Sequence, residues 1–427
     1  MSLTDRLSAF VQTARPSQDV LDVMAQSLFD WTACGIAGVG EPVSQIVRAQ
    51  AFGDGGADQS VLFGGGRVPA RAAAFVNGTV SHALDYDDTH FGHIGHPSVA
   101  IFSSLCAVPG VKGADLLNAA AVGSEVAVRV GQYLGRDHYQ IGFHQTATAG
   151  AFGAVAAVAR LRALDRDQTA HAFGLTATRA AGLKSQFGTM GKPMNAGLAA
   201  ECGVICADLA ARGMVSNPDA LDGPQGFTQT HHGQRDLSAI EDLGQVWRAA
   251  DVSHKLHACC HGLHAMIEAL GQNQSDPSAI QAVHIHTHPR WLSVCNQMEP
   301  RTGLQVKFSY THVAAMVLAG WDTADIASYS EACALDPALI AWRANVTVTG
   351  DDQLSESQAR VEVAQRDGHT QTYQYDLLDQ MQPAQKWAAL RRKAKALLGA
   401  DQEAALYSVL NADKAPDMDA LLDVMSR

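Results

Sequence analysis

Two consecutive segments of this chain consist largely of small apolar residues. The first, residues 146–164, carries Ala147, Gly150 and Gly153 among further alanines, and the second, residues 169–183, is also rich in alanine. The distance between packed helices depends on the size of the side chains at the contact, so small residues let a second helix approach closely. Helices of this composition usually lie in the middle of a bundle. These segments therefore predict a large helical domain around them.

Helical periodicity extends through most of the first 215 residues and returns after residue 382. In residues 16–35 the apolar side chains fall on one stripe, and glycines follow it, as at the end of a helix. Asp115 has the position of an N-cap for a helix over residues 115–134. Further helices are expected at residues 69–84, 383–398, 402–410 and 418–425.

After residue 255, alternating and β-branched segments appear among the helices. Strands are expected at residues 279–288, 345–348, 359–363 and 370–375, and helices at 259–270 and 306–319. A chain of 427 residues is longer than one hydrophobic core usually serves. We therefore predict a mainly α protein. Residues 1–253 and 381–427 form a large all-helical domain, and residues 254–380 form an inserted, smaller α+β domain.

The formal net charge is −12, and the chain has no run of lysine or arginine. Nucleic acids and anionic membrane surfaces are bound through basic patches, so we expect neither as a partner. The least polar long stretch, residues 146–159, is too short to cross a bilayer. Residues 1–6 lack the regions of a signal peptide, and the eight cysteines show no zinc-ribbon spacing. We therefore expect a reduced, cytoplasmic protein.

The densest group of polar residues occupies positions 82–98, in a glycine-containing loop after an apolar helix. It contains three carboxylates and three imidazoles, namely Asp85, Asp87, Asp88, His90, His93 and His96. Spacing alone leaves three interpretations open. These residue types are the usual ligands of a metal site. The aspartates of an exposed loop could instead cap neighbouring helices, or carboxylates could be paired with histidines for proton transfer.

A set of short segments, in a fixed order along the chain, resembles the MmgE/PrpD family. His82-Ala-Leu-Asp-Tyr-Asp-Asp-Thr89 and His96-Pro-Ser98 reproduce the family's H-A-x-D-[FY]-D-D-T and H-P-S signature. The other matching segments are residues 142–150, 182–184, 188–197, 221–227, 255–264 and 307–309. The resemblance covers residues 16 to 320 approximately. Each segment is short, but the ordered set is specific.

Members of this family include 2-methylcitrate dehydratase, cis-aconitate decarboxylase and iminodisuccinate epimerase. The resemblance implies a helical domain, a smaller α+β lid domain and a homodimer. It further implies catalysis without a metal or an organic cofactor, so no cofactor is expected. The metal interpretation of the loop at positions 82–98 therefore loses most of its weight.

Dehydration, decarboxylation and epimerisation of such acids all pass through a carbanion or enolate-like species beside a carboxylate. Without a metal, fixed cations and hydrogen-bond donors must stabilise that charge, and an acid or base must reach the reacting atoms. The predicted catalytic residues are Asp85, His96, His144 and His264. The predicted substrate-binding residues are Thr89, Lys192, Lys255, Cys260 and His312. The alternative for Lys192 is a lysine whose stem packs while its ammonium group reaches water.

Two positions differ from the decarboxylase pattern. This chain has His312 where the decarboxylases carry a tyrosine after the K-F-S start, although Tyr310 lies two positions earlier. It has Cys259 and Cys260 where the decarboxylase carries a histidine. Both changes fall at positions expected to contact the substrate, so they bear on the reaction rather than on the fold.

We expect a lyase, either a dehydratase or a decarboxylase, that acts on a small di- or tricarboxylate. One alternative is an isomerase or epimerase of a dicarboxylate, such as an iminodisuccinate-like acid, which moves a proton and releases nothing. Another is a dimer that binds a metabolite without catalysis.

Two further groups of histidines have simpler interpretations. His284, His286 and His288 alternate on a predicted strand, which we interpret as an exposed edge. His257 and His261 share a predicted helical face with His264, which the resemblance explains without a metal.

Overall fold

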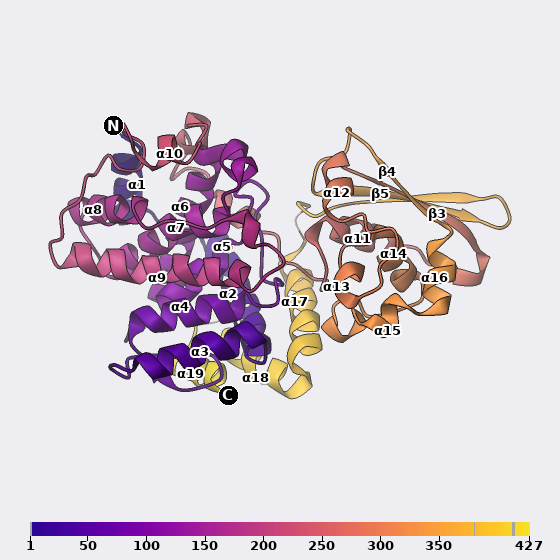
Figure 1. Cartoon of the computed structure of the whole chain (residues 1–427), viewed down its shortest axis with the longest axis horizontal. Coiled ribbons are helices and arrows are strands. Elements are labelled where there is room, and N and C mark those ends of the chain that lie inside the picture. Colours follow the sequence, from indigo (N-terminus) through magenta and orange to yellow (C-terminus); the bar gives the residue numbers. More distant parts are fainter. Residues whose placement is uncertain (1, 380, 412–414) are drawn as a thin grey trace. The chain divides into compact units, whose positions relative to one another are not determined.

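The computed structural model describes residues 2–379, 381–411 and 415–427, which form two compact units (Figure 1). The first unit comprises the chain up to His254 together with the C-terminal segment Leu398–Arg427. The second unit comprises Lys255–Leu397. The predicted α+β domain ends at residue 380, whereas the second unit continues to Leu397. The second unit therefore also contains nearly all of helix α17 (Pro383–Leu398). The type of a helix is visible in its sequence, but the unit in which it packs is not.

The first unit consists mainly of helices, coloured indigo to magenta in Figure 1, with two more from the end of the chain in yellow. A short antiparallel ladder joins β1 (Ser60–Val61) to β2 (Arg67–Val68). The helices are α1 (Leu3–Thr13), α2 (Gln18–Gly38), α3 (Pro42–Asp54), α4 (Ala70–Ser81), α5 (Pro97–Cys106), α6 (Gly113–Ile141), α7 (Gln145–Leu161), α8 (Arg166–Ala177), α9 (Gly191–Ala211), α10 (Phe227–Thr230), α18 (Ala400–Leu410) and α19 (Met418–Ser426). The prediction of a mainly α protein is confirmed.

Helix α7 lies in the middle of the bundle and contacts α5, α6, α8 and α9. Every residue from Gln145 to Ala159 is buried. A Cβ atom on Gly153 would lie 2.7 Å from the carbonyl oxygen of Gly123 on α6, and one on Gly123 would lie 2.8 Å from the carbonyl oxygen of Gly153. The small residues therefore permit the close approach predicted from the sequence. A larger side chain at either glycine would force the two helices apart.

Helix α9 is the main element that the sequence analysis missed. Gly191 and Pro193 suggest a loop, but both lie in the first turn of the helix, where a proline is tolerated. Among the described residues, α9 is the one helix long and apolar enough to cross a membrane. Of its apolar window, 61% is buried inside the protein, and the helix packs against α4, α5, α7 and α8. We therefore interpret α9 as a core helix.

The second unit contains a four-stranded sheet in the order β4-β3-β5-β6. Its strands are β3 (Ile280–Thr287), β4 (Val346–Gly350), β5 (Gln358–Gln365) and β6 (Thr370–Asp376). Strand β3 pairs in parallel with β4 and antiparallel with β5. All four predicted strands are confirmed. However, β3 is an inner strand, so the interpretation of His284 and His286 as residues of an exposed edge is wrong.

Helices cover one face of this sheet. Helix α11 (His264–Gly271) contacts β5 and β6, and α14 (Tyr310–Leu318) contacts β4. The other short helices are α12 (Pro289–Val294), α13 (Gly303–Val306), α15 (Glu331–Ala334) and α16 (Pro337–Arg343).

Three local predictions are wrong at helix ends. Lys112, not Asp115, is the N-cap of α6, and Asp115 lies in the first turn, where its charge favours the helix dipole. Helix α8 ends at Ala177 instead of continuing to residue 183. In the second unit, α11 begins only at His264, after a short 3₁₀ turn.

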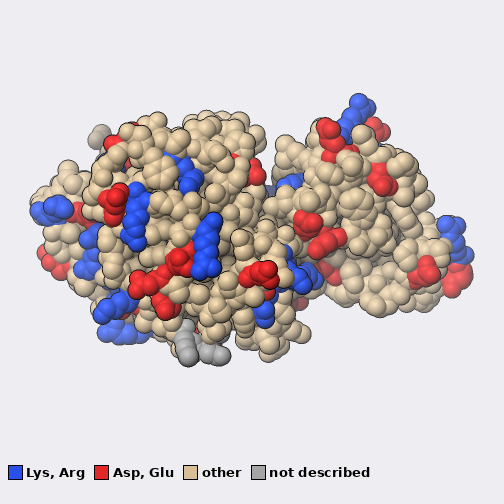
Figure 2. Space-filling view, turned by 90° about the horizontal axis from the view of Figure 1, so that it is seen from below, with Lys and Arg blue, Asp and Glu red and all other residues tan. Residues whose placement is uncertain are grey.

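Charged side chains of both signs are interspersed on the face shown in Figure 2. Lysine and arginine side chains lie next to aspartate and glutamate side chains instead of forming a basic stripe. Contacts with a phosphate backbone require such a stripe. For the residues coloured on this face, the distribution of charge therefore gives no support to nucleic-acid binding. That the whole surface does not bind nucleic acid stays a prediction.

Candidate active site

The loop between α4 and α5 carries the first predicted site residues. It runs from His82, the C-cap of α4, to His96, the N-cap of α5. Asp85 adopts a φ of 51°, in the left-handed region that aspartate and asparagine tolerate better than most residues. Within positions 82–98 only Gly92 is exposed. The interpretation as an exposed loop is therefore wrong.

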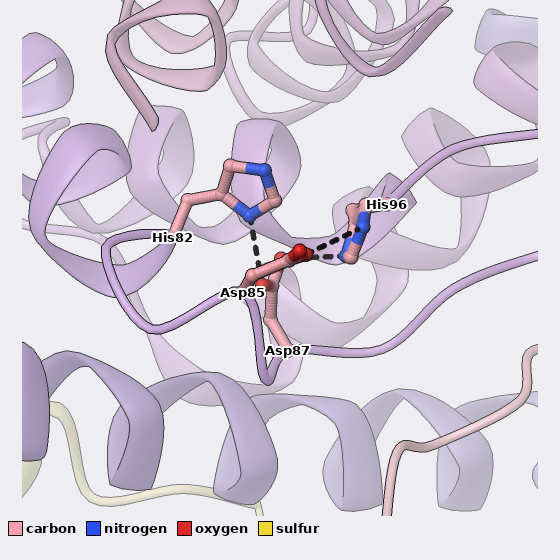
Figure 3. A group of neighbouring side chains, drawn as sticks. All are labelled: His82, Asp85, Asp87 and His96. Atoms are coloured by element: carbon pink, nitrogen blue, oxygen red, sulfur yellow. Dashed lines mark hydrogen bonds and ion pairs between the residues drawn. The ribbon is translucent and has the colours of Figure 1, made fainter. Parts of the chain in front are cut away.

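Asp87 lies between two imidazoles (Figure 3). Its Oδ1 accepts a hydrogen bond from Nδ1 of His82 at 2.8 Å, and its Oδ2 lies 3.3 Å from Nδ1 of His96. Burial raises the pKa of Asp87, but attraction to His82 and His96 outweighs burial and leaves this pKa well below its ordinary value. Asp87 is therefore an anion that orients both rings. A proton held on Nδ1 of His96 leaves its Nε2 as the atom that can accept another.

Asp85 faces that Nε2 atom. Its Oδ1 lies 3.3 Å from Nε2 of His96 and 2.5 Å from Nζ of Lys192. The side chain of Asp85 is 44% exposed, whereas that of Lys192 is 15% exposed and that of His96 is 10% exposed. A lysine this deeply placed needs an anion beside it, and Asp85 supplies one. The structure thus brings together three predicted site residues from α9 and the loop after α4.

His144 joins this group as the N-cap of α7. Its Nδ1 lies 3.3 Å from the side-chain amide of Asn195, and its ring packs edge-on against Phe187 at 4.9 Å. Lys192 lies over the same Phe187 ring, 5.4 Å from its centre. Burial, followed by the charge of Lys192 and the nearby imidazoles, lowers the pKa of His144 well below its ordinary value. His144 is therefore a neutral imidazole beside a fixed cation.

Asp88 has a different role. Its carboxyl oxygens accept hydrogen bonds from the backbone N–H of Ser98 at 3.3 Å and from its hydroxyl at 2.5 Å, in the first turn of α5. Asp88 thus performs the capping role that was one alternative for the aspartates of this loop. Burial raises the pKa of Asp88 to about 7 despite the hydrogen bond from Ser98, and Asp30 and Asp87 add to the rise.

Buried histidines are expected to make the first unit sensitive to acid. Burial lowers the pKa of His93 to about 3 and that of His138 to about 4. Both rings stay neutral in the folded chain, whereas an unfolded histidine gains a proton below about pH 6.5. Each is expected to reduce the free energy of unfolding by about 2 kcal/mol between pH 8 and pH 5. Asp88 acts in the opposite direction by a similar amount, because its raised pKa favours the folded state as the pH falls.

Together, His93, His138 and Asp88 are expected to lower the free energy of unfolding by about 2 kcal/mol between pH 8 and pH 5. The lowered pKa values of His90, His96 and His144 add to it. Urea unfolding at the two pH values measures the loss. Equal or greater stability at pH 5 would contradict the assignment of neutral, buried imidazoles.

In the second unit, His264 is part of a cluster of histidines at the start of α11. Its ring packs against His257 at 4.9 Å and against His261 at 4.6 Å. Burial, followed by the charges of His261, His257 and Lys255, lowers the pKa of His264 well below its ordinary value. Lys255 is itself only 5% exposed. The structure therefore places Lys255 and His264 in one buried, imidazole-rich cluster.

Of the remaining predicted residues, Cys260 lies in the same segment, between His257 and His261. Tyr310 reaches the same segment, because its hydroxyl donates to the carbonyl oxygen of Gly262 at 2.6 Å. His312 instead lies 3.1 Å, through Nε2, from the carbonyl oxygen of Cys333. Its contacts among the described residues give no support to the prediction that it binds substrate.

Thr89 lies in the first unit, beside Ser253 at the end of the first segment of that unit. Its backbone pairs with that of Ser253, with N–H···O distances of 2.8 and 2.7 Å in the two directions. The Thr89 hydroxyl lies 3.5 Å from the carbonyl oxygen of Ser253. The structure thus gives Thr89 a role in holding the loop, and its predicted role in substrate binding stays a prediction.

The sequence analysis did not assign a site role to His82 or Asp87, although both lie in the quoted motif. Their five-residue separation spans the turn after α4, and this separation lets the two side chains meet. Asn195 and Phe187, which flank His144, were missed as well. They lie 51 and 43 positions from it in the sequence, and no local pattern connects them.

The residues shown in Figure 3 are also of the types that bind metals. His82, Asp85, Asp87 and His96 offer ligand atoms that all lie within 4.8 Å of one another. However, Nδ1 of both histidines faces Asp87, and the ammonium group of Lys192 lies 2.5 Å from Asp85. A cation already present repels a second one. The arrangement therefore fits proton transfer beside a fixed ammonium group better than metal binding.

Comparison with known proteins places this arrangement in a family. The MmgE/PrpD N-terminal domain matches residues 5–240, and the MmgE/PrpD C-terminal domain matches residues 257–409. The cis-aconitate decarboxylase-like protein oryM of Aspergillus oryzae is 31% identical over 312 residues, which make up 66% of this chain and 64% of that protein. The match thus spans slightly less than two thirds of that relative.

Two cis-aconitate decarboxylases are also similar. The one from Aspergillus terreus is 28% identical over 335 residues, or 70% of this chain and 68% of that protein. The one from Homo sapiens is 32% identical over 199 residues, or 44% of this chain and 41% of that protein. The resemblance inferred from the ordered motifs is confirmed, and the chain belongs to the MmgE/PrpD family.

Proposed function

We propose that this protein is a lyase that removes carbon dioxide or water from a small di- or tricarboxylate, without a metal or an organic cofactor. The observation that carries the proposal is the position of Asp85, whose carboxylate contacts both Lys192 and Nε2 of His96. The names of the relatives support the substrate class, because cis-aconitate is a small polycarboxylate.

In the proposed reaction, Lys192 binds a carboxylate of the substrate. Asp85 holds the ammonium group at 2.5 Å in the ligand-free chain, and its partly exposed side chain can yield this position to an incoming carboxylate. Negative charge then develops on the carbon beside that carboxylate. A preorganised cation stabilises such charge more in the transition state than in the ground state.

His96 moves the proton. Burial lowers its pKa although Asp87 acts against this, so the ring is neutral near pH 7 and can act as a base through Nε2. In a dehydration, Nε2 takes the proton from carbon, and the neighbouring hydroxyl group leaves as water after protonation by a second acid. In a decarboxylation, the electrons of the broken C–C bond stay on carbon, which then takes a proton from Nε2 of His96 after that nitrogen has been protonated from solvent. Asp85, which is partly exposed and lies 3.3 Å from Nε2, is placed to relay the solvent proton.

The same proposal assigns roles to the remaining predicted residues except His312. His144 is a second neutral imidazole, beside Lys192. Lys255 supplies a second cation and His264 a further proton-transfer group, with Thr89 and Cys260 as substrate contacts. We also propose that the protein is a homodimer, which light scattering at several concentrations can test.

A panel of citrate-, aconitate- and aspartate-derived acids, analysed by mass spectrometry, tests the proposed reaction class. A lyase is expected to convert at least one acid with loss of carbon dioxide or water and a change in alkene absorbance. Uptake of solvent deuterium without any loss of mass would show an isomerase or epimerase instead. Binding of an acid without any of these signals would show a protein that only binds its metabolite.

Removal of metals is expected to leave turnover unchanged, because Lys192 occupies the cation position beside Asp85. The measurement is turnover before and after dialysis against a strong chelator, with metal analysis of both samples. Loss of turnover that returns when one metal ion is restored would refute metal-independent catalysis.

A further inference from the structure

The sheet of the second unit carries a second group of metal-ligand side chains, on the face opposite its covering helices. Along β3, Val283, Ile285 and Thr287 are buried, whereas His284 and His286 alternate with them. Strand β5 alternates in the same way, and its Glu362 lies directly opposite His284. Successive side chains of a strand point to opposite faces of the sheet. His284, His286 and Glu362 therefore share the face opposite α11.

The three side chains converge. The rings of His284 and His286 are 4.1 Å apart, and Nε2 of His286 lies 3.3 Å from Oε1 of Glu362. One ligand atom from each residue lies within 4.8 Å of those of the other two. Ligands at 2.0–2.2 Å from a tetrahedral zinc ion lie about 3.4 Å from one another. The separation of His286 and Glu362 thus already matches one edge of such a site.

A threonine on the neighbouring strand holds both imidazoles. The hydroxyl of Thr349 on β4 lies 2.9 Å from Nε2 of His284 and 3.3 Å from Nδ1 of His286. With Nδ1 held in this way, Nε2 of His286 is the ligand atom. It is buried and makes no hydrogen bond among the described residues, and the nearby group is Oε1 of Glu362, at 3.3 Å. Metal-binding histidines typically have their second nitrogen fixed by such a hydrogen bond.

The surrounding charges permit a cation. Arg360 lies 3.2 Å from Asp351 and 3.9 Å from Glu362, so one guanidinium group faces two carboxylates, and one negative charge remains.

We propose that His284, His286 and Glu362 bind a divalent transition-metal ion, for which zinc is the best match to two imidazoles and a carboxylate. The three ligands leave a fourth position for water. The ion joins β3 to β5 on the face opposite α11 and its His264, so its role is structural and separate from the proposed reaction.

Calorimetric titration of the chelator-treated full chain with Zn²⁺ at pH 7.5 tests the site. The variants are His286→Gln and Glu362→Gln, and the matched control is His369→Gln, an exposed histidine outside the cluster. His96→Gln serves as a second control, because His96 belongs to the other group of possible ligands. We expect one zinc ion per chain. Its affinity should fall at least 10-fold in the two variants, because even changes of the residues behind a ligand cost 10- to 100-fold.

Both controls are expected to bind zinc like the wild type, and zinc is expected to raise the melting temperature of the wild type but not of the two variants. Turnover should be unchanged in His286→Gln and Glu362→Gln, which separates this site from the proposed active site. Zinc binding of wild-type affinity in both variants, or its loss in His96→Gln alone, would overturn the proposal. If His286→Gln does not fold, Glu362→Gln gives the decision, because that side chain is 37% exposed.

Discussion

Replacement of Asp85 with asparagine is expected to lower turnover by about 100-fold or more while the protein stays folded. Asparagine keeps the shape of the side chain but removes its charge and its ability to exchange a proton with His96. It also tolerates the positive φ of 51° at this position, so the backbone of the loop is preserved. Turnover and melting temperature should be measured on the same sample.

The competing explanation is that Asp85 only stabilises a helix end. Loss of such a cap costs about 1 kcal/mol of stability and leaves the chemistry intact. The structure already weakens this explanation, since Asp88, not Asp85, bonds to the first turn of α5. Asp115→Asn is a matched control, because Asp115 is an exposed aspartate in the first turn of α6. A destabilised but fully active Asp85→Asn variant would remove Asp85 from the mechanism.

His96→Gln tests whether the two residues act as a unit. Each single variant removes one titratable partner from the contact between Nε2 of His96 and Oδ1 of Asp85, which is 3.3 Å long. The double variant should therefore be little slower than either single variant, because the effects of cooperating catalytic residues are not additive. Multiplicative losses would show that Asp85 and His96 contribute independently.

Lys192→Met is expected to weaken binding of the substrate and of dicarboxylate inhibitors by about 10- to 150-fold. A hydrogen bond from an ammonium group to a carboxylate contributes about 1.5–3 kcal/mol, and methionine keeps only the apolar stem. The measurement is the dissociation constant of a non-reacting dicarboxylate, determined by calorimetry. Lys112→Met is the matched control, because Lys112 is an exposed lysine at the start of α6.

The Lys192 variant also separates binding from folding. Loss of the Lys192 ammonium group leaves Asp85 without its partner at 2.5 Å. The carboxylate of Asp85 is 44% exposed, however, and water can solvate it. The fold is therefore expected to survive, as circular dichroism can check. Lys255→Met should show a loss of similar size if that lysine also binds a carboxylate. Unchanged dissociation constants in both variants would show that other groups supply the positive charge.

The sequence by itself determined the features that depend on local composition. The small residues of α7 predict a central helix, because only glycine and alanine allow α6 to approach as closely as Gly123 and Gly153 do. Alternation predicts the four strands of the second unit, because successive side chains of a strand point to opposite faces. The motif at positions 82–98 marks a candidate site, since its residue types titrate, bind metals or orient titrating groups, but its spacing alone leaves proton transfer, metal binding and helix capping open.

Only the tertiary structure decided which of these groups meet, and in which ionisation state. Asp85 and Lys192 are far apart in the sequence, and their contact depends on how α9, a helix that the sequence did not reveal, packs against the rest of the bundle. Asp87 and Asp88 are adjacent, yet the pKa of the first is lowered and that of the second is raised to about 7. The reason is physical: two imidazoles face one carboxylate, whereas burial dominates the other. Such energies depend on distances and burial, and a linear pattern of residues contains neither.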